Sequence, residues 1–341
     1  MTPAAPTQAV GALVPASATD RKASMLSTTR TFRAYSTSPS LRVIVDSCSS
    51  VTTEIAEQLG VDVIEFPFVM ADGDHRADQW ESITPAQFYG RMRAGERALT
   101  SAIPTGEFLD LFEACAREGV PTIYLSLTAG LSSSVRDAEQ AAADVSAKHP
   151  GFKIAALDNR MPSLTALMLA REVCHLRDGG SSFEEVVDFV RRAPDRVHGY
   201  FTLDSLRWLA AGGRIPKAAA SLSALLDMKA NLTYDLDGAL TLTGVSRGRK
   251  KALKGLVAKL DGNYVGGPGL PIGIADADCP EDADALERQV RAWFEAKGTP
   301  CPEIMHLTID ATIGSHVGPG MVALAFWGID RSAGGWNNGK R

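Results

Sequence analysis

Short apolar runs alternate with segments of helical periodicity along the first half of this chain. Apolar runs of strand length occupy residues 41–45, 61–69, 122–127 and 154–157. After each of them comes a helical pattern, and the clearest of these patterns cover residues 51–59, 135–147 and 164–176. Repeated units of strand, short loop and helix predict a parallel sheet with helices on both faces.

The pattern changes after His198, where strands outnumber helices. Strands are predicted at 199–203, 228–234, 240–245, 271–275, 304–309 and 321–326, and helices at 253–260 and 282–296. We therefore expect an N-terminal α/β domain at 41–195 and a C-terminal α+β domain with a mixed sheet at 196–330. Residues 1–40 are rich in Ala, Ser, Thr and Pro and are predicted to be disordered. A flexible tail is expected at 331–341.

Composition excludes several classes of function. Hydrophobic residues make up 45% of the 341 residues, and the net charge of -5 argues against a nucleic-acid partner. No apolar run approaches the roughly 18 residues that span a bilayer. The five cysteines are scattered, which is typical of a reducing compartment and predicts no metal site. A P-loop and an HExxH pair are absent from the sequence, and no cofactor is expected.

Candidate ligand-binding residues follow the predicted parallel strands, because ligands of such sheets collect at the carboxyl ends of the strands. Hydroxyl-bearing loops contain Ser47, Thr100 and Ser132. Ser132 begins a predicted helix, and the free N–H groups there stabilise a carboxylate or a phosphate. Taken alone, the composition favours a simpler role in which Ser132 only caps its own helix.

Basic side chains are candidates in the second half. Arg214 follows Gly212 and Gly213 at a predicted helix end, where its fork either binds an anion or lies in solvent beside the helix C-terminus. Arg247 opens a basic run of the kind that usually forms a solvated face. His316 is placed in a glycine-rich turn, where a hydrogen-bonding role is commoner than acid–base catalysis.

Four short motifs follow one another in a fixed order along the chain. They are TSAIPTGEF at 100–108, SLTAGLSS at 126–133, TLDSL at 202–206 with GGRI at 212–215, and HVGPG at 316–320. Together they resemble the DegV family, bacterial proteins that hold one fatty acid and can serve as the fatty-acid-binding subunit of a fatty acid kinase. The resemblance extends from about residue 41 to about residue 327.

The resemblance implies a role for each candidate residue. Thr100 and Ser132 match the threonine and serine that bind the fatty-acid carboxylate in the family, and Ser47 belongs to an opening Asp-Ser pair near the same site. The residues that match the family's polar groups at the tunnel mouth, where they face the acyl phosphate and the docked kinase, are Arg214, Arg247 and His316.

The chain departs from the family pattern near the acyl region, and its N-terminal segment has an unusual composition. Thr165 and Leu167 stand where the family often has glycines, and we expect them to narrow or redirect the acyl tunnel. Residues 25–42 contain arginines and hydroxyls but no acid, which is typical of an organellar transit peptide. We favour a translation start at Met25, because the family is bacterial.

These observations predict a carrier that binds one long-chain fatty acid and presents its carboxylate to a separate ATP-dependent kinase. The carrier would need no catalytic residue of its own, and we expect it in the cytoplasm. Two alternatives stay open. One is a stand-alone acyl hydrolase that uses Ser132 with His316, and the other is a lipid-responsive interaction protein without a kinase partner.

Overall fold

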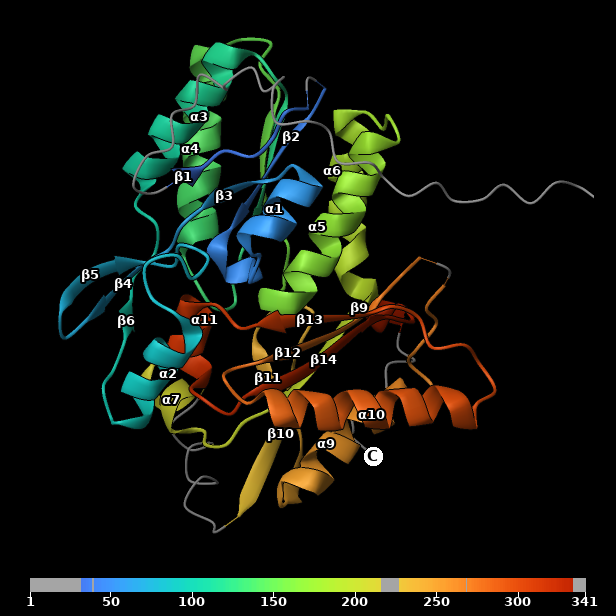
Figure 1. Ribbon diagram of the computed structural model, residues 1–341. Coiled ribbons are helices and arrows are strands. Elements are labelled where there is room, and N and C mark those ends of the chain that lie inside the picture. The colour runs from blue at the N-terminus through green and yellow to red at the C-terminus, as the bar shows by residue number, and fades with distance from the viewer. Residues whose placement is uncertain (1–31, 39, 216–226, 268, 334–341) are drawn as a thin grey trace, which may run out of the picture.

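The computed structural model describes residues 32–38, 40–215, 227–267 and 269–333, which form three sheets (Figure 1). The first sheet has the strand order β1-β3-β2-β7-β8. Its strands are β1 (Phe32–Arg33), β2 (Arg42–Asp46), β3 (Asp62–Ile64), β7 (Thr122–Ser126) and β8 (Ile154–Asp158). All of them except the edge strand β1 run parallel, which confirms the predicted parallel sheet.

Helices cover both faces of this sheet, as the alternating pattern predicts. One face carries α3 (Thr105–Glu118) and α4 (Ser134–Lys148), and the other carries α1 (Thr53–Leu59), α5 (Ser163–Asp178) and α6 (Phe183–Arg192) (Figure 1). Local capping signals account for several helix ends. The side chain of Ser182 accepts from the N–H of Glu185 at the start of α6, and Gly60 ends α1 with a φ of 57°.

The single strand expected at 61–69 is two strands in different sheets, so this prediction was wrong. After β3, the chain enters a three-stranded sheet of β4 (Pro67–Met70), β5 (Gly73–Arg76) and β6 (Leu99–Thr100). The N–H of Phe66 donates to Ser47 Oγ at 3.0 Å, and Pro67 has no N–H with which to continue a ladder. This break takes the chain out of the first sheet, and β6 then carries Thr100.

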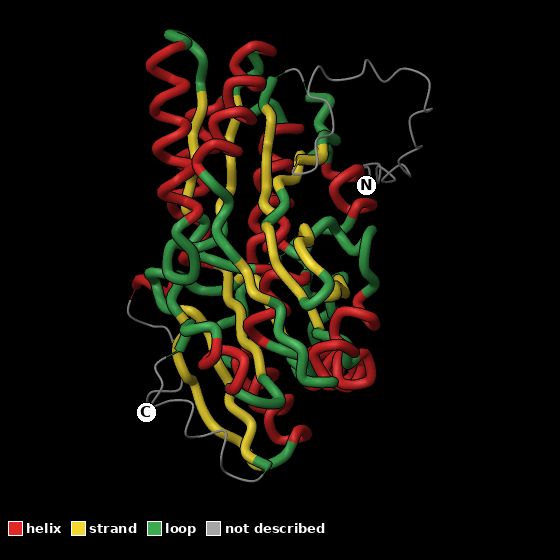
Figure 2. The backbone as a smooth tube through the Cα atoms, turned by 90° about the vertical axis from the view of Figure 1, so that its left-hand side faces the viewer, coloured by secondary structure: helices red, strands yellow, loops and turns green. Residues whose placement is uncertain are grey.

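The C-terminal half contains a six-stranded mixed sheet in the order β11-β10-β9-β14-β12-β13. Its strands are β9 (Val197–Thr202), β10 (Met228–Tyr234), β11 (Leu240–Arg247), β12 (Ile272–Asp276), β13 (Ile304–Thr308) and β14 (Val322–Trp327). One face packs against α9 (Arg249–Val257) and α10 (Pro280–Ala296), and the other packs against α5. Figure 2 shows the strands of this sheet and of the parallel sheet one above the other.

Helix α5 is the link between the two large sheets. A Cβ on Gly199 of β9 would lie 2.6 Å from Thr165 Cγ2 of α5, so the close contact between this helix and the sheet requires glycine. Residues of both halves consequently belong to one apolar cluster. The domain boundary predicted at 195/196 lies just before β9.

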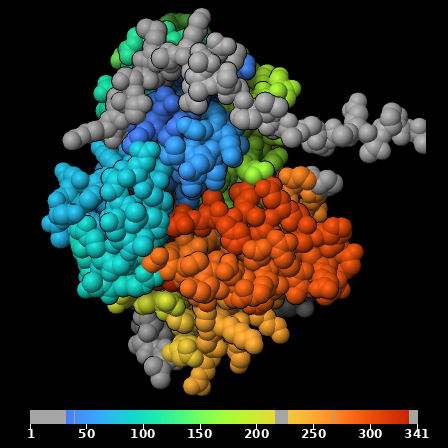
Figure 3. Space-filling view, in the orientation of Figure 1, coloured from blue at the N-terminus to red at the C-terminus, as the bar shows by residue number. Residues whose placement is uncertain are grey.

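Helix α2 (Pro85–Arg93) belongs to the N-terminal half of the sequence but binds the C-terminal half. Tyr89 Oη donates to the carbonyl of Ile309 at 2.8 Å, and Arg93 donates to the carbonyl of Asp278 at 2.6 Å. Figure 3 shows the surface of this cyan segment lying directly against the orange C-terminal half. The small sheet that carries Thr100 is thus held against the segment that carries His316.

Two short helices position the polar candidates. α7 (Arg207–Ala211) follows β9 and leads to Arg214, and α11 (Ala311–Val317) contains His316 in its last turn. The glycine-rich turn predicted around His316 was therefore wrong. The apolar pattern misses α11 because its residues are mostly small and include Gly314, a poor helix former. A local signal existed, since Asp310 accepts from the N–H groups of Thr312 and Ile313 as an N-cap.

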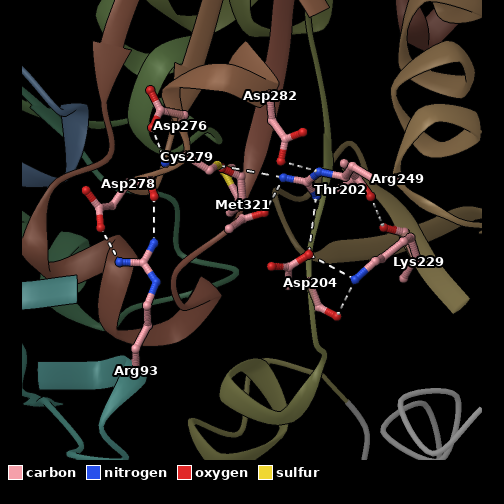
Figure 4. A network of polar contacts seen from close by, with 12 residues as sticks. Arg93, Thr202, Asp204, Lys229, Arg249, Asp276, Asp278, Cys279, Asp282 and Met321 are labelled. Carbon is pink, nitrogen blue, oxygen red and sulfur yellow. Dashed lines mark hydrogen bonds and ion pairs between the residues drawn. The ribbon is translucent and has the colours of Figure 1, made fainter. Parts of the chain in front are cut away.

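Ion pairs fix the chain at the point where β9 leads into α7 (Figure 4). Lys229 Nζ lies 2.9 Å from Asp204 Oδ1, and Arg249 Nε lies 2.8 Å from Asp282 Oδ2. A nitrogen of the same Arg249 guanidinium lies 3.9 Å from Asp204. These contacts join β10, α9 and α10 to Asp204, which lies just before α7, and so they support the segment that carries Arg214.

Both terminal segments contain structure where disorder was predicted. Phe32–Arg33 pairs with β3, and the N–H of Tyr35 donates to Asp62 at 2.7 Å. Arg331 is buried and donates to the carbonyl of Tyr234 at 2.9 Å. These partners are distant in sequence, so a local composition pattern does not reveal them. Residues 1–31, with the alternative start at Met25, and residues 334–341 lie outside the described residues.

Candidate functional site

A cleft of about 660 Å³, counted with the solvent at its mouth, lies between the two halves of the protein. Most of its wall is apolar and comes from distant elements, with Phe66, Leu127, Phe201, Tyr234, Val317 and Met321 among the side chains. Thr100, Ser132, Arg214 and His316 also line it. The structure thus brings together four of the six predicted site residues in one largely apolar cleft.

Thr100 and His316 form a hydrogen bond in the wall of this cleft. Thr100 Oγ1, at the end of β6, lies 2.8 Å from His316 Nε2. Burial, reinforced by the charge of Arg214, lowers the pKa of His316 to about 4. The imidazole is therefore neutral at pH 7 and carries one N–H.

The surroundings of the ring decide which nitrogen carries that proton. Nδ1 of His316 is buried and has no hydrogen-bond partner among the described residues. Buried N–H groups without an acceptor are rarer in proteins than unfilled acceptors, so we assign the proton to Nε2. The Nε2–H then donates to Thr100 Oγ1, which leaves the hydroxyl proton of Thr100 to donate into the cleft.

The Gly-Gly pair before Arg214 has a role beyond ending a helix. A Cβ at Gly212 would collide with Nδ1 of His316. The imidazole therefore reaches Thr100 only because position 212 has no side chain. Sequence reasoning predicted the helix end near Gly212 but had no signal for this contact between elements far apart in the chain.

Ser132 lies two residues before α4, whose N-cap is Ser133, and contributes to both the first turn of the helix and the cleft. Its Oγ accepts a hydrogen bond from the backbone N–H of Ser134 at 3.2 Å. The same hydroxyl donates a hydrogen bond to Ser134 Oγ, also at 3.2 Å. Ser134 Oγ in turn accepts from the N–H of Ile103 at 3.1 Å. The hydroxyl of Ser132 is thus tied to the segment just after Thr100, and the two hydroxyls share one wall of the cleft.

Arg214 joins the two halves beside this pair. Its Nε donates to the carbonyl of Leu131 at 3.3 Å, and its Nη1 donates to the carbonyl of Gly212. Burial lowers the pKa of this guanidinium from its usual value, although an arginine stays charged at neutral pH. The arrangement puts a partly desolvated positive charge next to the Thr100 and His316 pair.

Ser47 and Arg247 lie apart from the other four predicted residues. Ser47 faces a small neighbouring pocket and accepts from the N–H of Phe66, which itself lines the cleft. Arg247 is exposed at the end of β11. It is seven residues from Leu240 of the cleft wall, or about 23 Å at the usual strand rise of ~3.3 Å per residue.

Two buried carboxyl groups support the cleft. Asp46 accepts from the N–H of Leu127 at 2.6 Å and from Tyr124 Oη at 3.0 Å, and its burial raises its pKa to about 7. Asp310, which sequence reasoning did not single out, accepts from Ser50 Oγ at 2.8 Å, and burial raises its pKa to about 6. Asp46 holds a cleft-lining leucine, whereas Asp310 joins the start of α11 to the N-terminal half.

The described part of the chain contains no group of three or more His, Cys, Asp or Glu side chains arranged to hold a metal. Within the same residues, no helix has both the length and the apolar character needed to cross a bilayer.

Comparison with known proteins matches nearly the whole chain to one family. A family model described as "Uncharacterised protein, DegV family" matches residues 40–328. A DegV domain-containing protein of Clostridium perfringens is 29% identical over 287 residues, which cover 84% of this chain and 97% of the relative. A second such protein, from Lactococcus lactis, is 26% identical and covers 83% of this chain and 96% of its own.

Solved structures share this fold. A DegV family protein from Thermus thermophilus, described as binding fatty acid, is 26% identical with a TM-score of 0.73, covering 85% of this chain and 100% of its own. The Fatty Acid Kinase (Fak) B3 protein from Streptococcus pneumoniae, solved with linoleic acid, is 21% identical with a TM-score of 0.71. That alignment covers 84% of this chain and 99% of the other, and at this identity it shows the fold alone.

Proposed function

This chain belongs to the DegV family, and on that premise we propose that it binds one long-chain fatty acid in the cleft and presents the carboxylate to a separate ATP-dependent kinase. The observation that carries the proposal is an apolar cleft whose wall also holds the Thr100, His316 and Ser132 cluster. The fatty acid described for the Thermus relative supports the same ligand class.

Burial of the acyl tail would supply most of the binding free energy. A sixteen-carbon chain has fourteen methylenes, which at about 0.8 kcal/mol each give roughly 11 kcal/mol before the entropy cost of binding. The tail would lie against side chains such as Phe201, Tyr234 and Met321. Tyr234 packs against Thr165 of α5, so this departure from the family pattern would act on the tail through the tyrosine.

The carboxylate would accept two hydroxyl hydrogen bonds. His316 orients the hydroxyl of Thr100 by donating to its oxygen, and the hydroxyl of Ser132 turns from Ser134 toward the ligand. Hydrogen bonds to a charged group are stronger than hydrogen bonds between two neutral groups. Ser47 would act indirectly, because its Oγ accepts a hydrogen bond from the backbone N–H of Phe66, which lines the cleft.

The kinase would supply the chemistry. A carboxylate oxygen forms a bond to the γ-phosphorus of ATP as the bond from that phosphorus to the β-phosphate oxygen breaks, which gives an acyl phosphate and ADP. Arg214 would offset the charge that arrives with the phosphoryl group, and His316 would stay neutral beside it. Arg247, exposed and distant from the cleft, would contact the kinase surface.

The geometry favours a carrier over a stand-alone hydrolase. A hydrolase needs a base that accepts the proton of the nucleophilic serine. His316 Nε2 is hydrogen bonded to Thr100, whereas the hydroxyl of Ser132 donates to Ser134.

Native mass spectrometry of the purified protein, followed by lipid extraction, tests the proposal. We expect one fatty acid with a free carboxylate per chain, and acyl phosphate formation when a cognate kinase and ATP are added. Protein that carries no lipid and binds neither palmitate nor oleate would overturn the carrier function. Binding without phosphorylation by any kinase of the source genome would leave a lipid-responsive interaction protein.

A further inference from the structure

A short segment that precedes the family region is attached to the parallel sheet. Residues 32–38, which we call the strap, lie before residues 40–328, which the family model matches. The strand β1 at the start of the strap pairs with β3 (Figure 1). The N–H groups of Tyr35 and Ser36 then both donate to Asp62 Oδ1, at 2.7 and 2.6 Å. Because Asp62 is fully buried, the strap is part of the folded structure.

Arg33 of the strap is the partner of a buried carboxylate. Its Nε donates to Glu65 Oε1 at 2.9 Å, and the side chain of Glu65 is only 1% exposed. Burial raises the pKa of Glu65, and the Arg33 guanidinium acts in the opposite direction. A buried carboxylate that loses its cationic partner is strongly destabilised. The chain around Glu65 therefore depends on the strap.

Glu65 is the neighbour of Phe66, whose side chain lines the cleft. The N–H of Phe66 donates to Ser47 Oγ at 3.0 Å, and its carbonyl accepts from the N–H of Ala77 at 2.9 Å. The carbonyl of Glu65 accepts from Arg76 Nη1 at 3.2 Å. The Arg76 guanidinium is itself paired with an acid of α3, so the strap supplies the cation that is hydrogen bonded to the Glu65 carboxylate.

The strap also contacts the loop that follows β5. Tyr35 Oη donates to Gln79 Oε1 at 3.2 Å, and Arg33 Nη1 lies 2.8 Å from Glu81 Oε2. Gln79 and Trp80 have φ values of 60° and 70°, a backbone conformation that residues other than glycine keep only when their surroundings hold it. Both residues line the small pocket next to the cleft. The strap thus holds a segment of the cleft wall and the loop beside it.

We propose that the strap is part of the ligand-binding unit, and that Arg33 is a positioning residue that acts on the fatty acid through Glu65 and Phe66. This inference rests on the proposed function, because its main readout is palmitate affinity. The binding unit then begins at Phe32, before the family region. Any targeting segment that is removed from the N-terminus has to end before that residue.

Calorimetry of palmitate binding to delipidated full-length protein, at a temperature where every variant is folded, tests the inference. Arg33→Gln should raise the Kd about fivefold or more, because the buried carboxylate of Glu65 loses its partner and the wall at Phe66 shifts. Glu65→Gln in the same background should recover most of the affinity, since it removes the uncompensated charge. Arg191→Gln is the matched control, because its partner Asp188 is an exposed residue of α6, and the Kd should stay unchanged.

Further measurements distinguish a positioning role from a general effect on stability. In a Phe66→Ala background, Arg33→Gln should change the Kd no further, because its effect passes through that ring. Hydrogen exchange of the Phe66 amide should be faster in Arg33→Gln than in the wild type, but not in Arg191→Gln. Replacing residues 32–36 with a Gly-Ser sequence of equal length should weaken binding at least as much as Arg33→Gln. If this replacement does not fold, the single variant still decides.

The inference and the proposed function fail in different ways. If Arg33→Gln lowers the unfolding temperature but leaves the Kd at the wild-type value, the positioning role is overturned and the carrier stays intact. An equal effect of Arg33→Gln in the wild-type and Phe66→Ala backgrounds would also overturn it. Wild-type protein that binds no palmitate would instead count against the carrier function, and exchange of the Phe66 amide would still test the strap.

Discussion

The hydrogen bond between His316 and Thr100 makes a quantitative prediction about ligand affinity. If His316 acts only by orienting the Thr100 hydroxyl, its removal should matter only while that hydroxyl is present. The test is a double-mutant cycle of Thr100→Val and His316→Asn. Asparagine lacks an atom at the position of Nε2 and is smaller than the imidazole, so it fits beside Gly212.

The structure sets the expected magnitudes. Thr100→Val removes a hydrogen bond to a carboxylate, worth about 1.5–3 kcal/mol, or roughly a 13- to 160-fold increase in Kd. His316→Asn removes the 2.8 Å bond between neutral groups, worth about 0.5–1.5 kcal/mol, or roughly 2- to 13-fold. In the Thr100→Val background, His316→Asn should cost almost nothing. The coupling should thus equal the full effect of the single His316 variant.

The assay is isothermal calorimetry of palmitate binding to delipidated protein, with thermal unfolding of each variant as the folding control. His316→Gln, which places a donor near the position of Nε2, should recover most of the affinity. Additive effects of the two substitutions would refute the reasoning, because they would mean that His316 contacts the ligand independently of Thr100.

Three further predictions test neighbouring parts of the account. Ser132→Ala should weaken palmitate binding about tenfold or more, whereas Ser133→Ala, whose hydroxyl makes no cap hydrogen bond, should not. Neither variant should change esterase activity, and labelling of Ser132 by a fluorophosphonate would contradict this. The pKa of His316 is about 4 in the folded protein and about 6.5 in the unfolded chain. Between pH 6.5 and pH 4 the imidazole is therefore protonated in the unfolded chain but neutral in the folded protein. Wild type should therefore lose stability relative to His316→Asn as the pH falls from 6.5 to 4, measured by urea unfolding, and a constant difference would contradict the assignment. Thr165→Ala should free space beside Tyr234 and shift the extracted fatty acids toward longer or cis-unsaturated chains. An unchanged lipid profile would exclude Thr165 as a determinant.

Local patterns predicted much of the fold because they carry the periodicity and capping that define single elements. The strand predicted at 228–234 is β10 at the same bounds, and α2 and α6 begin at local capping boxes formed by Thr84 with Gln87 and by Ser182 with Glu185. The split after Ile64 has a local signal in Pro67, which lacks an N–H, but its other cause is a hydrogen bond from the N–H of Phe66 to Ser47, which is distant in sequence.

The candidate site likewise combines residues that local motifs predict with contacts that only the folded structure reveals. Motif order pointed to Thr100, Ser132, Arg214 and His316, and the structure places these four on one cleft. No local signal indicated that Gly212 makes room for the imidazole or that Arg97 and Arg214 donate to adjacent backbone carbonyls at the end of α7. Such relations arise when segments more than a hundred residues apart pack together. The ligand-binding roles of the four residues stay predictions until variants are measured.

Carbon-13 NMR of carboxyl-labelled palmitate bound to the full-length protein tests the central claim most directly. The account predicts one bound carboxylate resonance, distinct from free palmitate, that shifts in Thr100→Val and in Ser132→Ala but not in Ser133→Ala. A bound resonance that is the same in all four proteins would place the carboxylate elsewhere and contradict the account.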